Sequence, residues 1–244
     1  MNVAVLSDIH GVLPALEAVL AEPDVVAADR IVLLGDMLAG PMPVETFERL
    51  ASLGDRAVWV RGNADRELAE SARGTGTFVP DPIFPWAAEQ LRPADLPVLD
   101  ALPLTVTIGG VLFCHATPRD DTEIVLVDSP LERWADVLGG VTAETVVLGH
   151  THMPFTRLAD RRLIVNPGSV GMPYGTGGAH WALLGDGVQL RRTRYDAEAA
   201  CRFLAEHSAY PDIEEWADYF VRNPASDAEA LRVFSGSARG TSAT

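Results

Sequence analysis

The sequence predicts an α/β fold built around a largely parallel sheet. Near the N-terminus, short apolar runs alternate with segments of helical pattern, and each run ends at a turn that carries a polar side chain. Such alternation brings successive strands together in one direction, with their carboxyl ends at one edge of the sheet. The chain has 244 residues, 48% of them hydrophobic, which suffices for one large domain with a sizeable core.

The first elements follow this alternation closely. Residues 3–6 and 31–34 are fully apolar, as expected of strands buried on both faces, and residues 57–60 repeat the theme. Apolar side chains at helical spacing predict helices over residues 13–20 and 44–53. We therefore expect strand, helix, strand, helix, strand in this order.

The later elements are shorter and more varied. Residues 71–103 have a weak pattern, in which prolines interrupt short helical pieces around Trp86 and Leu91. Beyond them we predict a hairpin over 104–115 around Gly109-Gly110, a helix at 131–138, a strand pair at 155–158 and 163–165 around Asp160-Arg161, strands at 179–184 and 188–195, and a helix at 197–207.

The C-terminal end is expected to extend the main domain. We place a single domain at 1–210 and a helical extension with a flexible tail at 211–244, with a short acidic, aromatic helix after Pro211. Residues 235–242 consist mostly of Ser, Gly, Arg and Thr, and this composition predicts disorder. Truncation after Asn223 should then change turnover by no more than a few-fold, about 1 kcal/mol.

Charge and cysteine usage restrict the function. Lys and Arg total 19 against 34 Asp and Glu, so the net charge of -15 repels polyanions and argues against general nucleic-acid binding or an anionic membrane. Cys114 and Cys201 are far apart and predict buried thiols in a reducing compartment. With no signal peptide and no apolar run of about 20 residues, we expect a cytoplasmic protein; homo-oligomeric assembly is compatible with the sequence.

Histidines at strand ends are the first sign of a functional site. The apolar run 145–148 breaks at Gly149 and is followed by His150 and His152, whose alternate positions point to one face. Paired imidazoles of this kind suit a metal ion. On this evidence alone, a turn with two solvated histidines is an equally good interpretation of these residues.

Other strand ends supply matching groups. Asp8 and His10 follow the first strand at the same spacing, although Asp8 alone would equally suit a helix cap. The seven candidate ligands are Asp8, His10, Asp36, Asn63, His115, His150 and His152. So many ligands exceed one tetrahedral site and suit two metal ions that share a carboxylate. Because the set is rich in imidazole and has no thiolate, it favours Mn, Fe, Zn, Ni or Co over Cu(I) or Ca.

The order Asp-x-His, Gly-Asp, Gly-Asn, His, Gly-His-x-His resembles the calcineurin-like metallophosphoesterase superfamily over residues 1–195. Residues 34–41, 115–120 and 166–171 resemble its small bacterial and archaeal phosphodiesterase branch. The resemblance implies a four-layer α/β/β/α sandwich of two mixed sheets flanked by helices. It also implies that two divalent ions, manganese by preference, are held by Asp8, His10 and His152 and by Asn63, His115 and His150, with Asp36 as the bridge and with Asp36, Asn63 and His150 in catalytic roles.

The implied activity is hydrolysis of a small nucleotide-like phosphodiester by a water that the metal ions activate. The alternative is activity as a phosphomonoesterase, a dinucleoside-polyphosphatase or a protein phosphatase at the same centre. A third hypothesis is a metal-bound scaffold without turnover. One residue departs from the family pattern: Ala64 stands where many members carry a histidine that protonates the leaving group. This departure argues against efficient monoester hydrolysis and leaves leaving-group protonation unassigned.

Residues near these blocks have competing interpretations. Arg61 and Arg119 are candidates for substrate binding through phosphate, although exposed arginines are more often solvated. We interpret Asp65 as a structural cap and His180 as a packed or solvated strand residue. Ser169 lacks an adjacent base and is expected to be structural.

Overall fold

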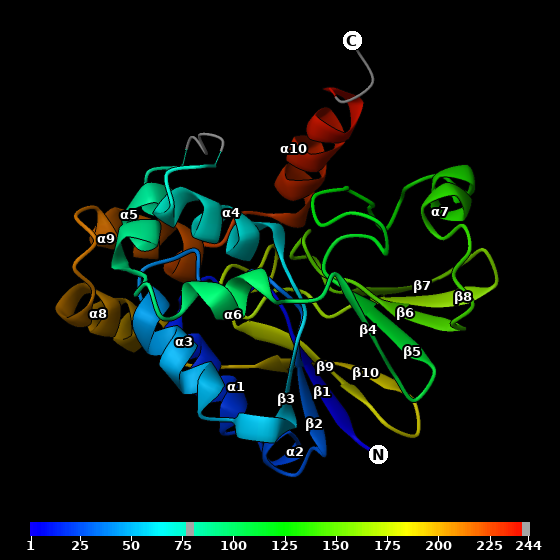
Figure 1. Ribbon diagram of the computed structural model, residues 1–244, viewed down its shortest axis with the longest axis horizontal. Helices are drawn as coiled ribbons and strands as arrows, with labels where there is room; N and C mark the ends of the chain where they lie inside the picture. Colours follow the sequence, from blue (N-terminus) through cyan, green and yellow to red (C-terminus); the bar gives the residue numbers. More distant parts are fainter. Residues whose placement is uncertain (77–80, 241–244) are drawn as a thin grey trace.

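Two five-stranded sheets form the centre of the computed structural model, which describes residues 1–76 and 81–240 (Figure 1). The first sheet has the order β10-β9-β1-β2-β3, with β1 Val3–Leu6, β2 Arg30–Leu33, β3 Ala57–Trp59, β9 Ala179–Leu184 and β10 Val188–Thr193. The second has the order β4-β5-β6-β8-β7, with β4 Thr105–Ile108, β5 Val111–Cys114, β6 Thr145–Val147, β7 Phe155–Ala159 and β8 Arg162–Asn166.

Both sheets are mixed. Strands β1, β2 and β3 are parallel, as predicted from their alternation with helices, and β5, β6 and β8 are parallel in the second sheet. Strands β9 and β10 are antiparallel additions, and β4 and β7 each join through a two-residue hairpin turn. In those turns Gly109, Gly110, Asp160 and Arg161 all have positive φ, which matches the twist of a tight hairpin.

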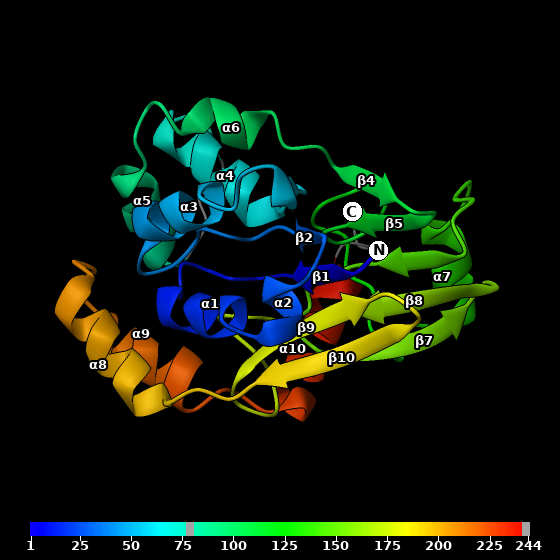
Figure 2. The ribbon, with the colours of Figure 1, turned by 90° about the horizontal axis from the view of Figure 1, so that it is seen from below.

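Helices cover the outer faces of the two sheets unequally (Figures 1 and 2). The face of the first sheet is covered by α1 Leu13–Leu20, α3 Pro43–Ala51, α4 Asn63–Ala72, α5 Ile83–Gln90, α6 Leu96–Asp100, α8 Ala197–His207 and α9 Ile213–Ala217. The second sheet is covered by α7 Leu131–Val137, whose Trp134 is fully buried. The result is the α/β/β/α sandwich that the resemblance implied, with a thin fourth layer.

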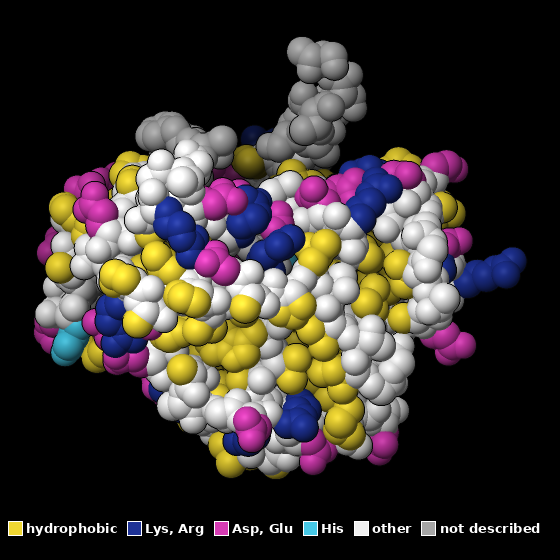
Figure 3. Space-filling view, viewed as in Figure 1, with side chains coloured by type: hydrophobic (Ala, Val, Ile, Leu, Met, Phe, Trp, Pro, Cys, Tyr) yellow, Lys and Arg dark blue, Asp and Glu magenta, His cyan; other side chains and the backbone are white. Residues whose placement is uncertain are grey.

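The alternation of side chains along β1 and β2 separates two cores. Val3, Val5 and Val32 point into the space between the sheets, whereas Leu6 and Leu33 point toward the helices. Figure 3 shows hydrophobic side chains over α6, β3 and the β4–β5 hairpin. The core between the sheets includes residues of β3 and of the hairpin, whereas α6 packs on the core beneath the helices. Among the described residues, no helix combines the length and apolar character that crossing a membrane requires.

The C-terminal segment has the predicted helix after Pro211, but it is helical further along the chain than we expected. Helix α9 and the π-helical turn η2 Asp218–Arg222 pack against α8, and Trp216 and Val221 belong to the main core. We expected disorder from Ser235, but α10 Asp227–Gly240 is helical through that segment, and residues 241 and 242 lie outside the described residues. Two other helices, α2 Pro23–Val26 and α4, were also not predicted.

Candidate metal centre

All seven candidate ligands meet at the edge where the carboxyl ends of the parallel strands lie. They follow β1, β2 and β3 of the first sheet and β5 and β6 of the second. Six of them form two groups whose ligand atoms lie within 4.8 Å of one another: Asp8, His10 and His152 in one group, and Asp36, His115 and His150 in the other. The sequence predicted this convergence, and the structure shows that the two sheets contribute jointly to each group.

Unusual backbone angles aim these side chains. Five of the seven residues have positive φ between 48° and 65°, which non-glycine residues seldom adopt: Asp8, His10, Asp36, His150 and His152. Each such residue typically costs about 1–3 kcal/mol, so the surrounding structure must enforce it. Backbone hydrogen bonds from Asp8 N to Gly35 O and from His10 N to Asp36 O, both 3.0 Å, link the turns after β1 and β2.

Two glycines are required by close packing beneath the site. A Cβ atom at Gly149 would lie 2.1 Å from Ser7 Oγ and 2.9 Å from Asp8 Oδ2. A Cβ atom at Gly62 would lie 2.2 Å from both the backbone nitrogen and Oδ1 of Asp36. Any side chain at either position would displace a candidate carboxylate ligand.

Backbone carbonyls set the orientation of three imidazoles. The Nδ1 atoms of His10, His115 and His152 lie 3.0, 2.8 and 2.7 Å from the carbonyl oxygens of Ala39, Leu34 and Met172. Each Nδ1–H therefore donates to a carbonyl, and Nε2 is the ring nitrogen directed into the site. His150 presents Nδ1 instead, 3.1 Å from the side-chain oxygen of Asn63.

The carboxylates divide their oxygens between structure and site. Asp36 Oδ1 accepts a hydrogen bond from Ala64 N (2.8 Å), while Oδ2 lies 3.2 Å from His115 Nε2 and 4.0 Å from His10 Nε2. Asp8 Oδ2 accepts from Ser7 Oγ and His150 N, and Oδ1 lies 3.2 Å from His152 Nε2. A single oxygen of Asp36 thus reaches both groups.

Several contacts suit a bound cation. The Nε2 atoms of His10 and His152 lie 3.2 Å apart, and the same His152 Nε2 lies 3.2 Å from buried Asp8 Oδ1, so three potential ligand atoms converge. The Asn63 oxygen lies 3.3 Å from His115 Nε2 as well as near His150. Hydrogen bonding alone would favour the reversed amide, with NH₂ toward these acceptors, whereas an oxygen among lone pairs is the orientation that a metal ion stabilises.

The charges of the site are strongly coupled. Burial alone would lower the pKa of His115, but Asp36 and Asp8 outweigh it and raise this pKa to about 10. Burial would raise the pKa of Asp36, yet the neighbouring histidines hold it well below its usual range. Burial and the charge of His115 lower the pKa of His150 to about 4, which keeps its lone pair available. A divalent cation can replace the proton that His115 and Asp36 share.

The two arginines proposed for substrate binding are engaged with carboxylates. Arg61 Nε lies 3.0 Å from Asp121 Oδ2, and the exposed Arg119 pairs with Glu123 and Asp136. The sequence patterns did not single out Arg66, which donates two 3.0 Å hydrogen bonds to the same Asp121 carboxylate. Arg66 follows Asn63 by three residues on α4, and this spacing places the two on one helix face once the helix is known.

Supporting residues behave as the sequence predicted. Buried Asp65 accepts hydrogen bonds from the backbone nitrogens of Asp36, Met37 and Gly62, so it both caps α4 and holds the turn after β2. Ser169 Oγ donates to Asp8 O (2.7 Å), and His180 is buried with Nε2 2.9 Å from Thr176 O. These contacts confirm the structural interpretation of all three residues.

Asn166 has a structural role that the sequence alone did not show. It is the last residue of β8, and its Nδ2 donates to Gly149 O (2.8 Å) and to Thr151 Oγ1 (3.1 Å). Its Oδ1 accepts from Gly168 N (2.8 Å). Asn166 therefore holds the turn that carries His150 and His152.

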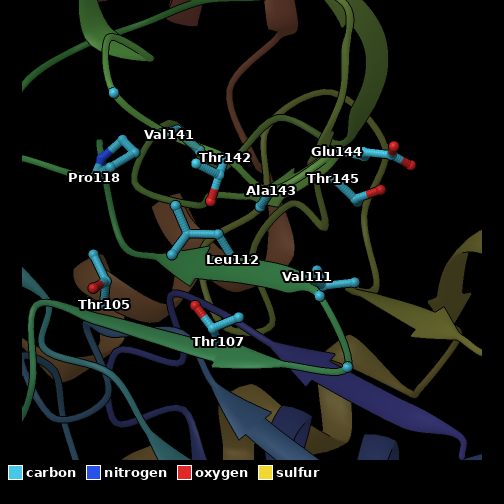
Figure 4. Close-up of a pocket in the computed structure, with 13 residues that line it drawn as sticks. Thr105, Thr107, Val111, Leu112, Pro118, Val141, Thr142, Ala143, Glu144 and Thr145 are labelled. Atoms are coloured by element: carbon cyan, nitrogen blue, oxygen red, sulfur yellow. The ribbon is translucent and has the colours of Figure 1, made fainter.

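A pocket elsewhere on the surface does not suit a phosphoester. Its cavity volume is about 640 Å³, and it lies between the β4–β5 hairpin and the loop before β6 (Figure 4). Its lining includes Leu112, several threonines and Glu144, but none of the candidate ligands and no lysine or arginine among the described residues. An anionic substrate would meet a carboxylate there, so the strand-end cluster is the better candidate site.

The family model for the calcineurin-like phosphoesterase superfamily domain matches residues 1–185. The chain belongs to this superfamily. Membership implies divalent metal ions and a phosphoester hydrolase, in agreement with the two groups of potential metal ligands.

Individual relatives agree with this assignment. The chain is 28% identical to phosphodiesterase YfcE of Escherichia coli K12 over 197 residues, which cover 77% of this chain and 89% of YfcE. It is also 28% identical to the uncharacterized protein MJ0912 of Methanocaldococcus jannaschii, over 88% of this chain and 94% of that one. A crystal structure of a metallophosphoesterase from Sphaerobacter thermophilus superposes with a TM-score of 0.72 and 25% identity, covering 91% of this chain and all of the other.

Proposed function

We propose that this member of the superfamily is a phosphodiesterase that hydrolyses small nucleotide-like phosphodiesters with two divalent metal ions. The observation that carries the proposal is the position of Asp36 Oδ2, which lies 3.2 Å from an imidazole of one group and 4.0 Å from an imidazole of the other. Asp8, His10 and His152 would hold one ion, and Asn63, His115 and His150 the other. Manganese suits this oxygen and imidazole set.

The carboxylates, the Asn63 amide and the backbone carbonyls of the chain set the charge of the site and the orientation of its ligands. When bound, the metal pair supplies an activated water and stabilises charge on the phosphoryl oxygens. Asp36 and Asp8 remain ionised and provide the negative charge that balances the ions, while Asn63 is neutral and leaves the centre electrophilic. The carbonyls of Ala39, Leu34 and Met172 keep three imidazoles in the tautomer that presents Nε2.

The preference for diesters rests on Ala64. This residue is 2% exposed and is the second residue of α4, directly after Asn63. Its methyl group cannot protonate a leaving group. A poor alkoxide leaving group needs a placed acid, whereas a nitrophenolate leaves without one. The relationship to a phosphodiesterase of E. coli supports the same preference. The net charge of -15 supports a small substrate rather than a nucleic acid, and we further propose a cytoplasmic location.

The test compares leaving groups at matched metal content. The native protein should hydrolyse bis-p-nitrophenyl phosphate well and alkyl monoesters poorly. Ala64→His should improve kcat/KM for poor leaving groups, by up to about 10²-fold for a well-placed acid, and barely change it for activated ones. Ala64→Gln is the control, because glutamine is similar in size to histidine but cannot act as a general acid.

Two outcomes would contradict the proposal. Equal changes for both leaving groups in Ala64→His would show that position 64 does not govern proton transfer. Faster turnover of alkyl monoesters than of activated diesters by the native protein would identify it as a phosphomonoesterase instead.

A further inference from the structure

Helix α10 lies over the candidate metal centre. In Figure 1 it rises from the edge at which the strand ends meet. The Phe234 ring lies 6.4 Å from the His150 ring and 6.0 Å from the Tyr174 ring, with Tyr174 and Phe234 edge to face. Tyr174 in turn lies 5.7 Å from the His152 ring. Two aromatic side chains thus connect one histidine of each ligand group.

The helix is docked by its own core. Ala230 is 1% exposed and packs in a cluster with Leu126 and Met153, which are also buried. The chain before the helix is fixed by a hydrogen bond from Gly175 N to Ala225 O (2.8 Å). Because Met153 directly follows His152, the packing of α10 continues into the turn that carries the metal-ligand candidates.

We propose that Phe234 and Tyr174 form an aromatic wall that contacts a planar ester group of the substrate, so that aryl or nucleobase-bearing phosphodiesters are preferred over alkyl ones. The inference rests on the proposed function. A phosphate held between the two ligand groups must project its two ester groups into the surrounding space. On the side of His150 and His152 that space is bounded by two aromatic rings, which bind a planar group by stacking or by edge-to-face contact.

The kinetic test uses two activated diesters with the same leaving group. Bis-p-nitrophenyl phosphate and methyl p-nitrophenyl phosphate both release p-nitrophenolate, so they differ only in the remaining ester group. In the metal-loaded full-length protein, Phe234→Ala should lower kcat/KM for the bis-aryl diester by roughly five- to tenfold, mainly through KM. The methyl diester should change by less than about twofold, so the ratio between the substrates falls.

Matched variants separate recognition from folding. Phe234→Tyr keeps a ring and should preserve the ratio, whereas Phe234→Leu keeps apolar packing and should lose it. Arg232→Ala changes an exposed residue of the same helix and should leave the ratio unchanged. If Phe234→Ala does not fold, Phe234→Leu decides the question.

Binding without turnover tests the wall independently of hydrolysis. Calorimetry should show that diphenyl phosphate binds the loaded protein more tightly than dimethyl phosphate does, and that Phe234→Leu removes most of the difference. Absence of turnover with both nitrophenyl diesters would refute the proposed function, while this binding difference would still report on the wall. The inference would be overturned if Phe234→Ala lowered kcat/KM equally for both nitrophenyl diesters, or raised it equally because the ring had obstructed the site. It would also be overturned if diphenyl phosphate and dimethyl phosphate bound the native protein equally tightly.

Discussion

In the absence of a metal ion, His115 and Asp36 share a proton at the centre of the site. Their atoms Nε2 and Oδ2 lie 3.2 Å apart, and both side chains are almost completely buried. The attraction raises the pKa of His115 to about 10 although burial opposes it. The proton thus occupies a position that the proposed metal centre needs for a cation.

This coupling predicts how metal binding depends on pH. The pKa of His115 is raised on folding above its ordinary value of 6.5, so its protonation stabilises the metal-free fold fully below pH 6.5, and this contribution is lost as pH rises toward about 10. Binding near pH 7 must displace the proton, so the apparent metal affinity should increase with pH, by up to about tenfold per unit for one proton.

Calorimetric titration with Mn²⁺ in two buffers of different ionisation enthalpy measures this release directly. We expect about one proton to be released per His115-containing site at pH 7. An observed heat that is independent of the buffer would show that no proton is displaced.

Among the elements, the turn after β2 and the start of α4 depend on one side chain. Asp65 accepts hydrogen bonds of 2.8, 2.9 and 3.2 Å from the backbone nitrogens of Asp36, Met37 and Gly62. Asp65→Ala would leave three buried donors without a partner, each costing about 1–3 kcal/mol before relaxation. We expect the free energy of unfolding of the metal-free protein to fall by about 2–4 kcal/mol.

Urea unfolding of the native protein and the variant measures this difference. Asp55→Ala, in the exposed 3₁₀ turn η1 Gly54–Arg56, is the control and should change stability by less than about 0.5 kcal/mol. A loss below about 1 kcal/mol in Asp65→Ala would mean that water or a shifted backbone replaces the carboxylate.

The elements also show which parts of the site the sequence could predict. His115 and His150 were recognisable because each follows an apolar run, and parallel strands bring such ends together whatever the details of packing. The pairing of Arg66 with Asp121 joins residues 55 positions apart, and no local pattern encodes it. Phe234 was missed for the same reason, since its contact with His150 depends on how α10 folds back.

Helix α10 did leave a signal in the sequence. Ser226 and Glu229 have the spacing of a capping box, and Ser226 Oγ accepts a hydrogen bond from Glu229 N (3.2 Å). The prediction that truncation after Asn223 changes turnover by no more than a few-fold rested on the absence of ligand candidates beyond that residue and on an end segment unlikely to pack. Buried Ala230 and the contact of Phe234 with His150 show that α10 packs before that end segment, so the truncation would also remove these contacts.

At the scale of the whole molecule, the proposed ions would join the two sheets. His10 lies after a strand of the first sheet and His152 after a strand of the second. An ion held between these two histidines would therefore bind only the folded protein. At a free metal concentration of about 100 times Kd, binding increases the free energy of unfolding by about 2.7 kcal/mol. For a chain of this size we expect Tm to rise by about 5–10 °C.

Thermal unfolding after chelation and after reloading with Mn²⁺ measures the gain. Asp36→Asn keeps the shape of the bridging side chain but removes its charge, so this variant should bind fewer ions by elemental analysis and lose most of the increase in Tm. Asp186→Asn, in the exposed turn between β9 and β10, is the control. Two tightly bound ions in Asp36→Asn would refute the bridging role.

The distance along the chain between His10 and His152 also concerns how the protein folds. These histidines are 142 residues apart, and their Nε2 atoms lie 3.2 Å from each other. Bringing such distant positions together requires that both sheets have formed and docked, which is slow compared with local contacts. During synthesis the N-terminal strands can assemble first, but the centre stays incomplete until the turn after β6 has emerged. Capture of the proposed ions would therefore be a late event, which stabilises a finished fold but does not guide its formation.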